Sequence, residues 1–67
     1  MKNFEVIIVR FAYSVPPPKF HRYVNADTAT DAERITETEI IPQIAKDRGE
    51  HGWENFYTIK SVKEVVK

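Results

Sequence analysis

Hydrophobic positions along the chain change their spacing near residue 27, and this change predicts the order of the elements. Before it, apolar and polar residues alternate as on half-buried strands. After it, apolar residues recur at helical spacing behind a Thr/Asp cap, and aromatic residues return from Trp53 on. We therefore expect a single α+β domain over residues 1–67, with the order β-β-α-β. It should form a three-stranded antiparallel sheet with one kinked helix packed on one face.

The first predicted strand, Phe4–Tyr13, carries apolar residues on both faces. Val6 and Ile8 share one face, whereas Ile7 and Phe11 share the other. A strand of this kind is typical of the centre of a sheet, so the third strand should pair with the first. One helix covers one face. The other face is then covered either by a partner or by the C-terminal segment.

Three consecutive prolines, at 16–18, end the first strand and hold the backbone near polyproline II. We interpret them as a rigid loop in preference to a polyproline ligand. Alternation returns over Lys19–Ala26, which predicts a second strand antiparallel to the first, with Val24 and Ala26 facing the helix.

The start of the helix has two candidate caps. Thr28 with Asp31, or Thr30 with Glu33, would each satisfy early amide donors, and the second pair is the better capping box. An apolar stripe follows at helical spacing. Its members are Ala29, Ala32, Thr36, Ile40 and Ile44.

Pro42 interrupts this helix, because proline removes one hydrogen bond and disfavours helical geometry at Ile41. The helix should either kink, which would turn Ile41 toward the core, or stop near Ile40 and restart. We expect its end at Gly49, as a left-handed cap. The third strand is predicted over Trp53–Lys60 and should continue to about Lys63.

Composition narrows the class of protein. The 67 residues include no cysteine, which excludes disulfides and thiolate zinc sites, and the apolar content of 42% favours a folded chain. No apolar run approaches the roughly 18 residues of a membrane span. The strand pattern starts so early that we expect no signal peptide, and hence a cytoplasmic protein.

The sequence offers little for catalysis or for metal binding. His21 and His51 are the only histidines, and neither lies in a recognisable catalytic motif, so we do not expect an enzyme or a cofactor. Asp47, Glu50, His51 and Glu54 have the side chains of metal ligands. Their spacing matches neither an EF-hand nor a zinc motif, which favours a hydrated loop.

Charge is distributed unevenly although the net charge is zero. The first 25 residues are basic and residues 26–50 are acidic, which is typical of a solvated acidic helix beside a mildly basic sheet. Lys19, His21 and Arg22, with neighbouring aromatic residues, could bind nucleic acid through the sheet. We keep this as the alternative function, since strong binders usually have excess cationic charge.

The favoured hypothesis is a non-catalytic protein-binding module, forming a homodimer or docking on a protein partner through the face away from the helix. The expected apolar anchors are aromatic, and the exposed helix face would meet a basic partner. The anchors are Phe11, Tyr13, Tyr23 and Trp53, and the acidic residues are Asp31, Glu33 and Glu37. Short, cysteine-free proteins with an acidic helix include phage- or mobile-element-encoded inhibitors of larger host assemblies. This comparison rests on general character and not on any shared motif.

Overall fold

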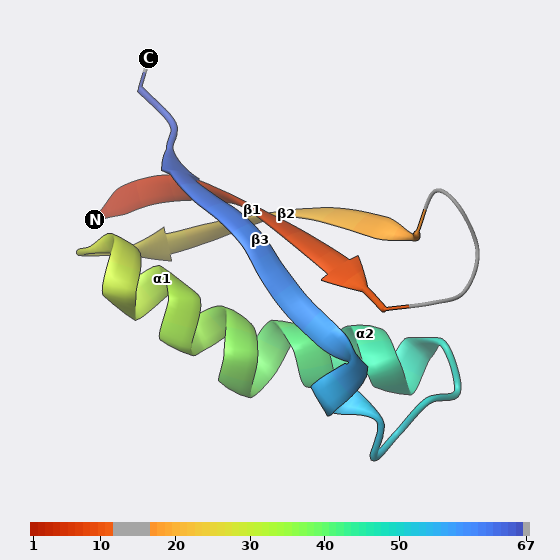
Figure 1. Ribbon diagram of the computed structural model, residues 1–67. Coiled ribbons are helices and arrows are strands. Elements are labelled where there is room, and N and C mark those ends of the chain that lie inside the picture. Colours follow the sequence, from red (N-terminus) through yellow and green to blue (C-terminus); the bar gives the residue numbers. More distant parts are fainter. Residues whose placement is uncertain (12–16, 67) are drawn as a thin grey trace.

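The structure, a computed structural model, describes residues 1–11 and 17–66 and has the expected order of elements (Figure 1). Three antiparallel strands form one sheet in the order β2-β1-β3, and a helical segment from Ala29 to Asp47 lies across one face of it. The strands are β1 (Lys2–Arg10), β2 (Lys19–Ala26) and β3 (Tyr57–Glu64). The predicted fold class and the central place of the first strand are confirmed.

β1 begins two residues earlier than predicted and ends at Arg10, not at Tyr13. The Arg10 N–H donates to the Pro18 carbonyl at 3.1 Å, and proline has no N–H with which to return a bond. The ladder between β1 and β2 therefore ends at this pair. Tyr13 lies outside the described residues.

β3 begins at Tyr57, so the prediction that Trp53 starts this strand is wrong. Glu54–Phe56 instead forms the 3₁₀ turn η2, in which the Phe56 N–H donates to the Trp53 carbonyl at 3.0 Å. The strand ends at Glu64, one residue beyond the expected end. Within it, Ser61 pairs with Ile7 and Ile59 with Ile8, which leaves Lys60 as the extra residue of a β-bulge.

The helix starts at the first of the two candidate caps, not at the preferred one. Thr28 has an extended backbone, and its Oγ1 accepts from the Asp31 N–H at 3.1 Å. β2 ends at Ala26, only two residues earlier, and Thr30 already lies in the first helical turn. The chain therefore enters the helix so soon after β2 that Thr28 is the cap, although Thr30 with Glu33 would make the better capping box.

The irregularity expected at Pro42 is a π-helical turn directly before it, and the helix continues without a stop. Its three parts are α1 (Ala29–Ile35), η1 (Thr36–Ile40) and α2 (Ile41–Asp47). The Ile41 N–H donates to the Thr36 carbonyl, five residues back. The Thr36 and Thr38 hydroxyls also donate to carbonyls four residues back, a bond that tends to bend helices.

The π turn changes which residues face the sheet, because it adds one residue between two buried positions. Thr36 and Ile41 are both buried although they stand five residues apart, and Ile44 and Ala45 follow them on the same side. At about 100° per residue, an unbroken α-helix would turn Ile41 away from Thr36. The expected turn of Ile41 toward the core is confirmed.

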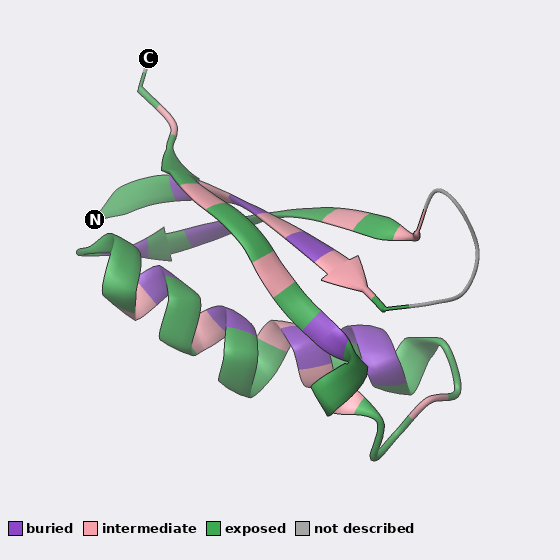
Figure 2. Ribbon diagram, viewed as in Figure 1, coloured by how far each residue is buried: buried purple, intermediate pink, exposed green. Residues whose placement is uncertain are grey.

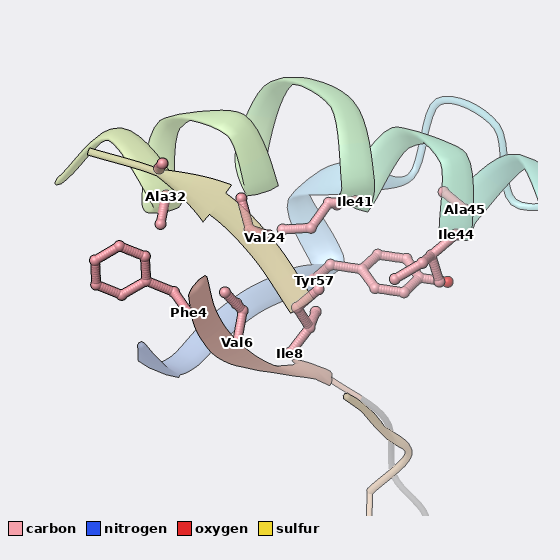
Figure 3. Packing of buried hydrophobic residues seen from close by; sticks show 10 residues of the cluster. Phe4, Val6, Ile8, Val24, Ala32, Ile41, Ile44, Ala45 and Tyr57 are labelled. Atoms are coloured by element: carbon pink, nitrogen blue, oxygen red, sulfur yellow. The ribbon is translucent and has the colours of Figure 1, made fainter. Parts of the chain in front are cut away.

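The core lies between the sheet and the helix (Figure 2). In Figure 3, side chains of β1 and β2 face the helix, and the Tyr57 ring reaches toward α2. The buried apolar residues are Phe4, Val6, Ile8, Val24, Ala26, Ala32, Ile41, Ile44, Ala45 and Tyr57. Within residues 1–11 and 17–66, Thr36 is the one buried polar residue, and its hydroxyl donates to the Ala32 carbonyl at 2.7 Å.

The second face of the sheet has no cover from the described residues, and Ile7 and Val9 are only half-buried there. The C-terminal segment does not lie over this face as one of the two expectations had it. Instead, the Val65 N–H donates to the Asn3 carbonyl at 2.8 Å, so this segment extends the pairing with β1. No helix of the described chain combines the length and the apolar character needed to cross a membrane.

Candidate functional site

The C-terminal end of the helix positions Glu50, which contacts more polar side chains than any other described residue. Gly49 has φ +73°, the Gly49 N–H donates to the Lys46 carbonyl, and the Glu50 N–H donates to the Ala45 carbonyl. These two bonds form a Schellman motif, in which glycine tolerates the left-handed backbone. The predicted left-handed cap at Gly49 is confirmed. It fixes the backbone of Glu50 beside the ends of β1 and β3.

The Glu50 carboxylate accepts hydrogen bonds from three side chains. Arg10 donates from Nε at 3.0 Å and forms the closer ion pair through Nη2 at 2.6 Å, which makes a bidentate contact. The Tyr57 hydroxyl donates to the same carboxylate, and Arg48 Nε lies 3.4 Å away. The side chains of Arg10 and Glu50 are only 15% and 19% exposed, so this network ties the helix end to both strands.

These contacts shift the protonation equilibria of the network. The hydrogen bonds from Arg10 and then Tyr57 lower the pKa of the Glu50 carboxyl from an ordinary 4.5 to about 2. Burial, and then the hydrogen bond to Glu50, raises the pKa of Tyr57. Glu50 is therefore ionised in the folded protein well below the pH at which an unfolded chain would protonate it.

The network predicts a pH dependence of stability. Because the folded pKa of Glu50 lies below its unfolded value, its contribution is present above about pH 4.5 and is lost toward pH 2. We expect Glu50→Gln to be less stable than the wild type at pH 7, with a gap that closes as the pH falls through this window. Urea unfolding followed by circular dichroism at pH 7, 4 and 2.5 measures the gap. A gap that stays constant would contradict the assigned role, and Glu37→Gln, on the exposed helix surface, is the control.

Three exposed aromatic residues, which we call the aromatic cluster, lie beside this network: Phe11, Trp53 and Phe56. The Phe11 N–H donates to the Phe56 carbonyl at 2.7 Å, and the Trp53 and Phe56 rings lie 5.6 Å apart between centroids. The guanidinium of Arg10 lies 5.7 Å from the Phe56 ring centre, within cation–π range. Their exposed fractions are 61%, 53% and 39%. The Trp53 and Phe56 rings thus lie together beside a polar support, and Phe11 is joined to them through its backbone.

The structure brings two of the four predicted anchors together and separates a third. Phe11 adjoins Phe56 through its backbone and Trp53 adjoins Phe56 through its ring. Tyr23, by contrast, pairs across the sheet with Glu5, which stands six residues before Phe11. At about 3.3 Å per residue, Tyr23 therefore lies roughly 20 Å from Phe11 along the sheet. The Tyr23 hydroxyl donates to the Glu5 carboxylate at 3.3 Å. The structure thus places Tyr23 well apart from Phe11, and Tyr13 lies outside the described residues.

The acidic residues predicted for a basic partner lie apart from the aromatic cluster. Glu33 and Glu37 are exposed on the helix, and Asp31 forms an ion pair of 3.6 Å with Arg34, one turn further on. All three lie in the part of the helix that follows the Thr28 cap, whereas the cluster lies beyond its other end. One partner would have to span the helix to contact both groups.

Lys19, His21 and Arg22, the residues of the nucleic-acid alternative, are all exposed on β2. Lys19 lowers the pKa of Lys60 through a side-chain hydrogen bond and through charge repulsion. Arg22 donates to the His21 carbonyl at 2.8 Å, and its guanidinium lies 6.0 Å from the Phe20 ring centre.

The described residues include no metal-binding group and line two shallow cavities. In the described ranges, no three His, Asp or Glu side chains converge as they would around a metal ion, and Glu50 is already engaged by Arg10 and Tyr57. Two shallow cavities have volumes of about 240 and 280 Å³. Both lie below the usual size of a pocket for a small molecule, about 300–1,000 Å³. Comparison with protein-family models, with curated proteins and with solved structures finds no match to this chain.

Sequence reasoning missed the support of the cluster. Arg10 and Glu50 stand 40 residues apart, and no local pattern connects them. Phe56 was not among the predicted anchors. The place of Phe56 depends on the 3₁₀ turn. The aromatic residues between Trp53 and Tyr57 predicted a strand there, so the turn was not expected.

Proposed function

We propose that this chain is a non-catalytic protein-binding module whose docking surface is the aromatic cluster. The observation that carries the proposal is the exposure of Phe11, Trp53 and Phe56 together, beside a fixed polar network. Aromatic residues dominate the energetics of protein interfaces, and tryptophan is enriched among the residues that matter most. A surface already held in place loses less entropy on binding.

A protein partner suits this surface better than a small molecule does. The cluster projects outward, and neither of the two shallow cavities is lined by one of its residues. Cations lie on the same side, since Arg10 and Arg48 both contact Glu50. A partner with an apolar centre and an acidic rim would complement both features.

Capture from an extract of the native host, with chemical cross-linking and mass spectrometry, tests the proposal. The variant Phe11→Ala/Trp53→Ala should lose the partner that the wild type captures. The variant Tyr23→Ala/Val66→Ala removes two other exposed apolar side chains and should retain it. Retention of the partner by the cluster variant would refute this docking surface.

Two further measurements, sedimentation and an activity assay, separate the finer forms of the proposal. A homodimer through the cluster would sediment as a dimer and become a monomer in Phe11→Ala/Trp53→Ala. An inhibitor of a larger assembly would reduce the activity of the captured assembly when added as the purified protein. The cluster variant should fail to do so.

A second candidate function, binding of single-stranded nucleic acid on the open face, is supported by the exposed cations of the sheet, Lys19 on β2 and Lys60 on β3. Exposed lysines can neutralise the phosphates of a nucleic-acid backbone. Binding of a labelled oligonucleotide should then weaken steeply with salt and should fall in Lys19→Gln/Lys60→Gln. An absence of binding at low salt removes this candidate.

A further inference from the structure

The outer edge of β2 exposes backbone groups that no neighbouring strand pairs with, as the hydrogen-bond alternation shows. The Arg10 N–H bonds to the Pro18 carbonyl, so the pair 10–18 is hydrogen-bonded, and the register makes 8–20 and 6–22 hydrogen-bonded as well. The N–H and C=O groups of the alternate residues, His21 and Tyr23, therefore point away from β1. Among the described residues, no loop or helix backbone group bonds to them.

The two edges of the sheet differ in their protection. β3 is interrupted by the bulge at Lys60, and bulges and lysines both discourage strand pairing at an edge. β2 pairs with β1 in one unbroken register over eight positions and contains no proline. Its one partial block is Arg22, whose side chain donates to the outward His21 carbonyl at 2.8 Å. The β2 edge is therefore the one suited to receive another strand.

A groove of about 280 Å³ runs beside this edge, between β2 and the helix. Its floor is apolar, made by Ile40 and Ile44, and Arg22 lines it from the side of β2. Helix residues spaced by four, Glu39, Gln43 and Asp47, also line it, and the Gln43 amide donates to Asp47 at 2.8 Å. Two carboxylates against one guanidinium leave a net negative charge in the lining.

We propose that β2 and this groove form a strand-addition site for an extended peptide segment whose groove-facing residue is lysine. In an antiparallel addition, peptide residues opposite His21 and Tyr23 exchange backbone hydrogen bonds, and the residue opposite Arg22 directs its side chain over the groove. The aliphatic part of lysine covers Ile40 and Ile44. Its ammonium group reaches the carboxylates of Glu39 and Asp47, past Arg22 on the near side. This site is separate from the aromatic cluster and goes beyond the proposed function.

A capped heptapeptide probe, Thr-Val-Thr-Lys-Thr-Val-Thr, tests the site by NMR titration of the full chain. We expect shift changes at the His21 and Tyr23 amides and at the Ile40 and Ile44 methyl groups. A probe with glutamate in place of the central lysine should bind about fivefold more weakly, as expected for exposed ion pairs. N-methylation of the third and fifth probe residues should abolish binding, whereas N-methylation of the central lysine, whose N–H points outward, should not.

Matched variants of the protein test the charge. Glu39→Gln/Asp47→Asn should remove the preference for lysine over glutamate, and Glu33→Gln/Glu37→Gln, on the same helix, should preserve it. Shift changes elsewhere, equal binding of both probes, or no binding would overturn the proposal. So would sedimentation of the free protein as a dimer with protected His21 and Tyr23 amides, since a second copy would then occupy the edge. None of these results bears on capture through Trp53, so the two proposals fail independently.

Discussion

Ile8→Ala should leave the protein largely unfolded at 25 °C. Ile8 is fully buried in the centre of β1, the central strand, and it is among the largest side chains with no exposure. Truncating a buried isoleucine to alanine costs about 2–5 kcal/mol. A single core in a domain of this size supplies only about 3–5 kcal/mol. Urea unfolding followed by far-ultraviolet circular dichroism should show little or no folded baseline for this variant.

Ile7→Ala is the matched control, because Ile7 is the adjacent residue on the other face of the same strand. It is half-buried, and its side chain alternates with those of the buried Val6 and Ile8, so we expect a clear folded baseline and a smaller loss of stability. Equal losses from the two variants would contradict a core confined to the helix side of the sheet.

Deletion of Thr38 should be tolerated, whereas deletion of Arg34 should abolish folding. Thr38 lies in the π turn, which holds one residue more than α-helical spacing needs between Thr36 and Ile41. Removing it brings these two buried residues to a spacing of four, so both still face the sheet. Arg34 lies in α1, and removing it rotates Ala32 relative to Thr36 by about 100°.

Both deletions remove one exposed residue from the same helix, so they control for each other. Thermal unfolding followed by circular dichroism compares them. Thr38 deletion should give a cooperative transition close to that of the wild type, and Arg34 deletion should give none. Similar loss of folding in both would mean that the π turn is required for its own sake, and not only to keep the buried positions in phase.

Much of the fold could be predicted because its strands and helix obey simple periods. The alternation of apolar and polar residues predicted the observed bounds of β2. β1, which is apolar on both faces, was correctly placed in the centre of the sheet. The π turn was missed because the stripe was counted at a fixed angle. The spacing of five between Thr36 and Ile41, just before Pro42, is a readable signal for such a turn.

The candidate site was less predictable, because it depends on contacts between distant segments. Phe11 and Trp53 were named, but their meeting through Phe56 depends on the 3₁₀ turn and on the pairing of β3 with β1. The support from Arg10 depends on Glu50, which the Schellman motif positions after the helix. Gly49 predicted the end of the helix but not the side chain that the next residue would bind.

Isothermal titration of the captured partner against three forms of the protein tests the central claim most directly. The forms are the wild type, Phe11→Ala/Trp53→Ala and Tyr23→Ala/Val66→Ala. If the aromatic cluster is the docking surface, the first variant should bind at least about 30-fold more weakly than the wild type, as for residues that dominate an interface. The second should bind within about threefold of it. Unchanged affinity in the cluster variant, with its fold confirmed by circular dichroism, would contradict the account.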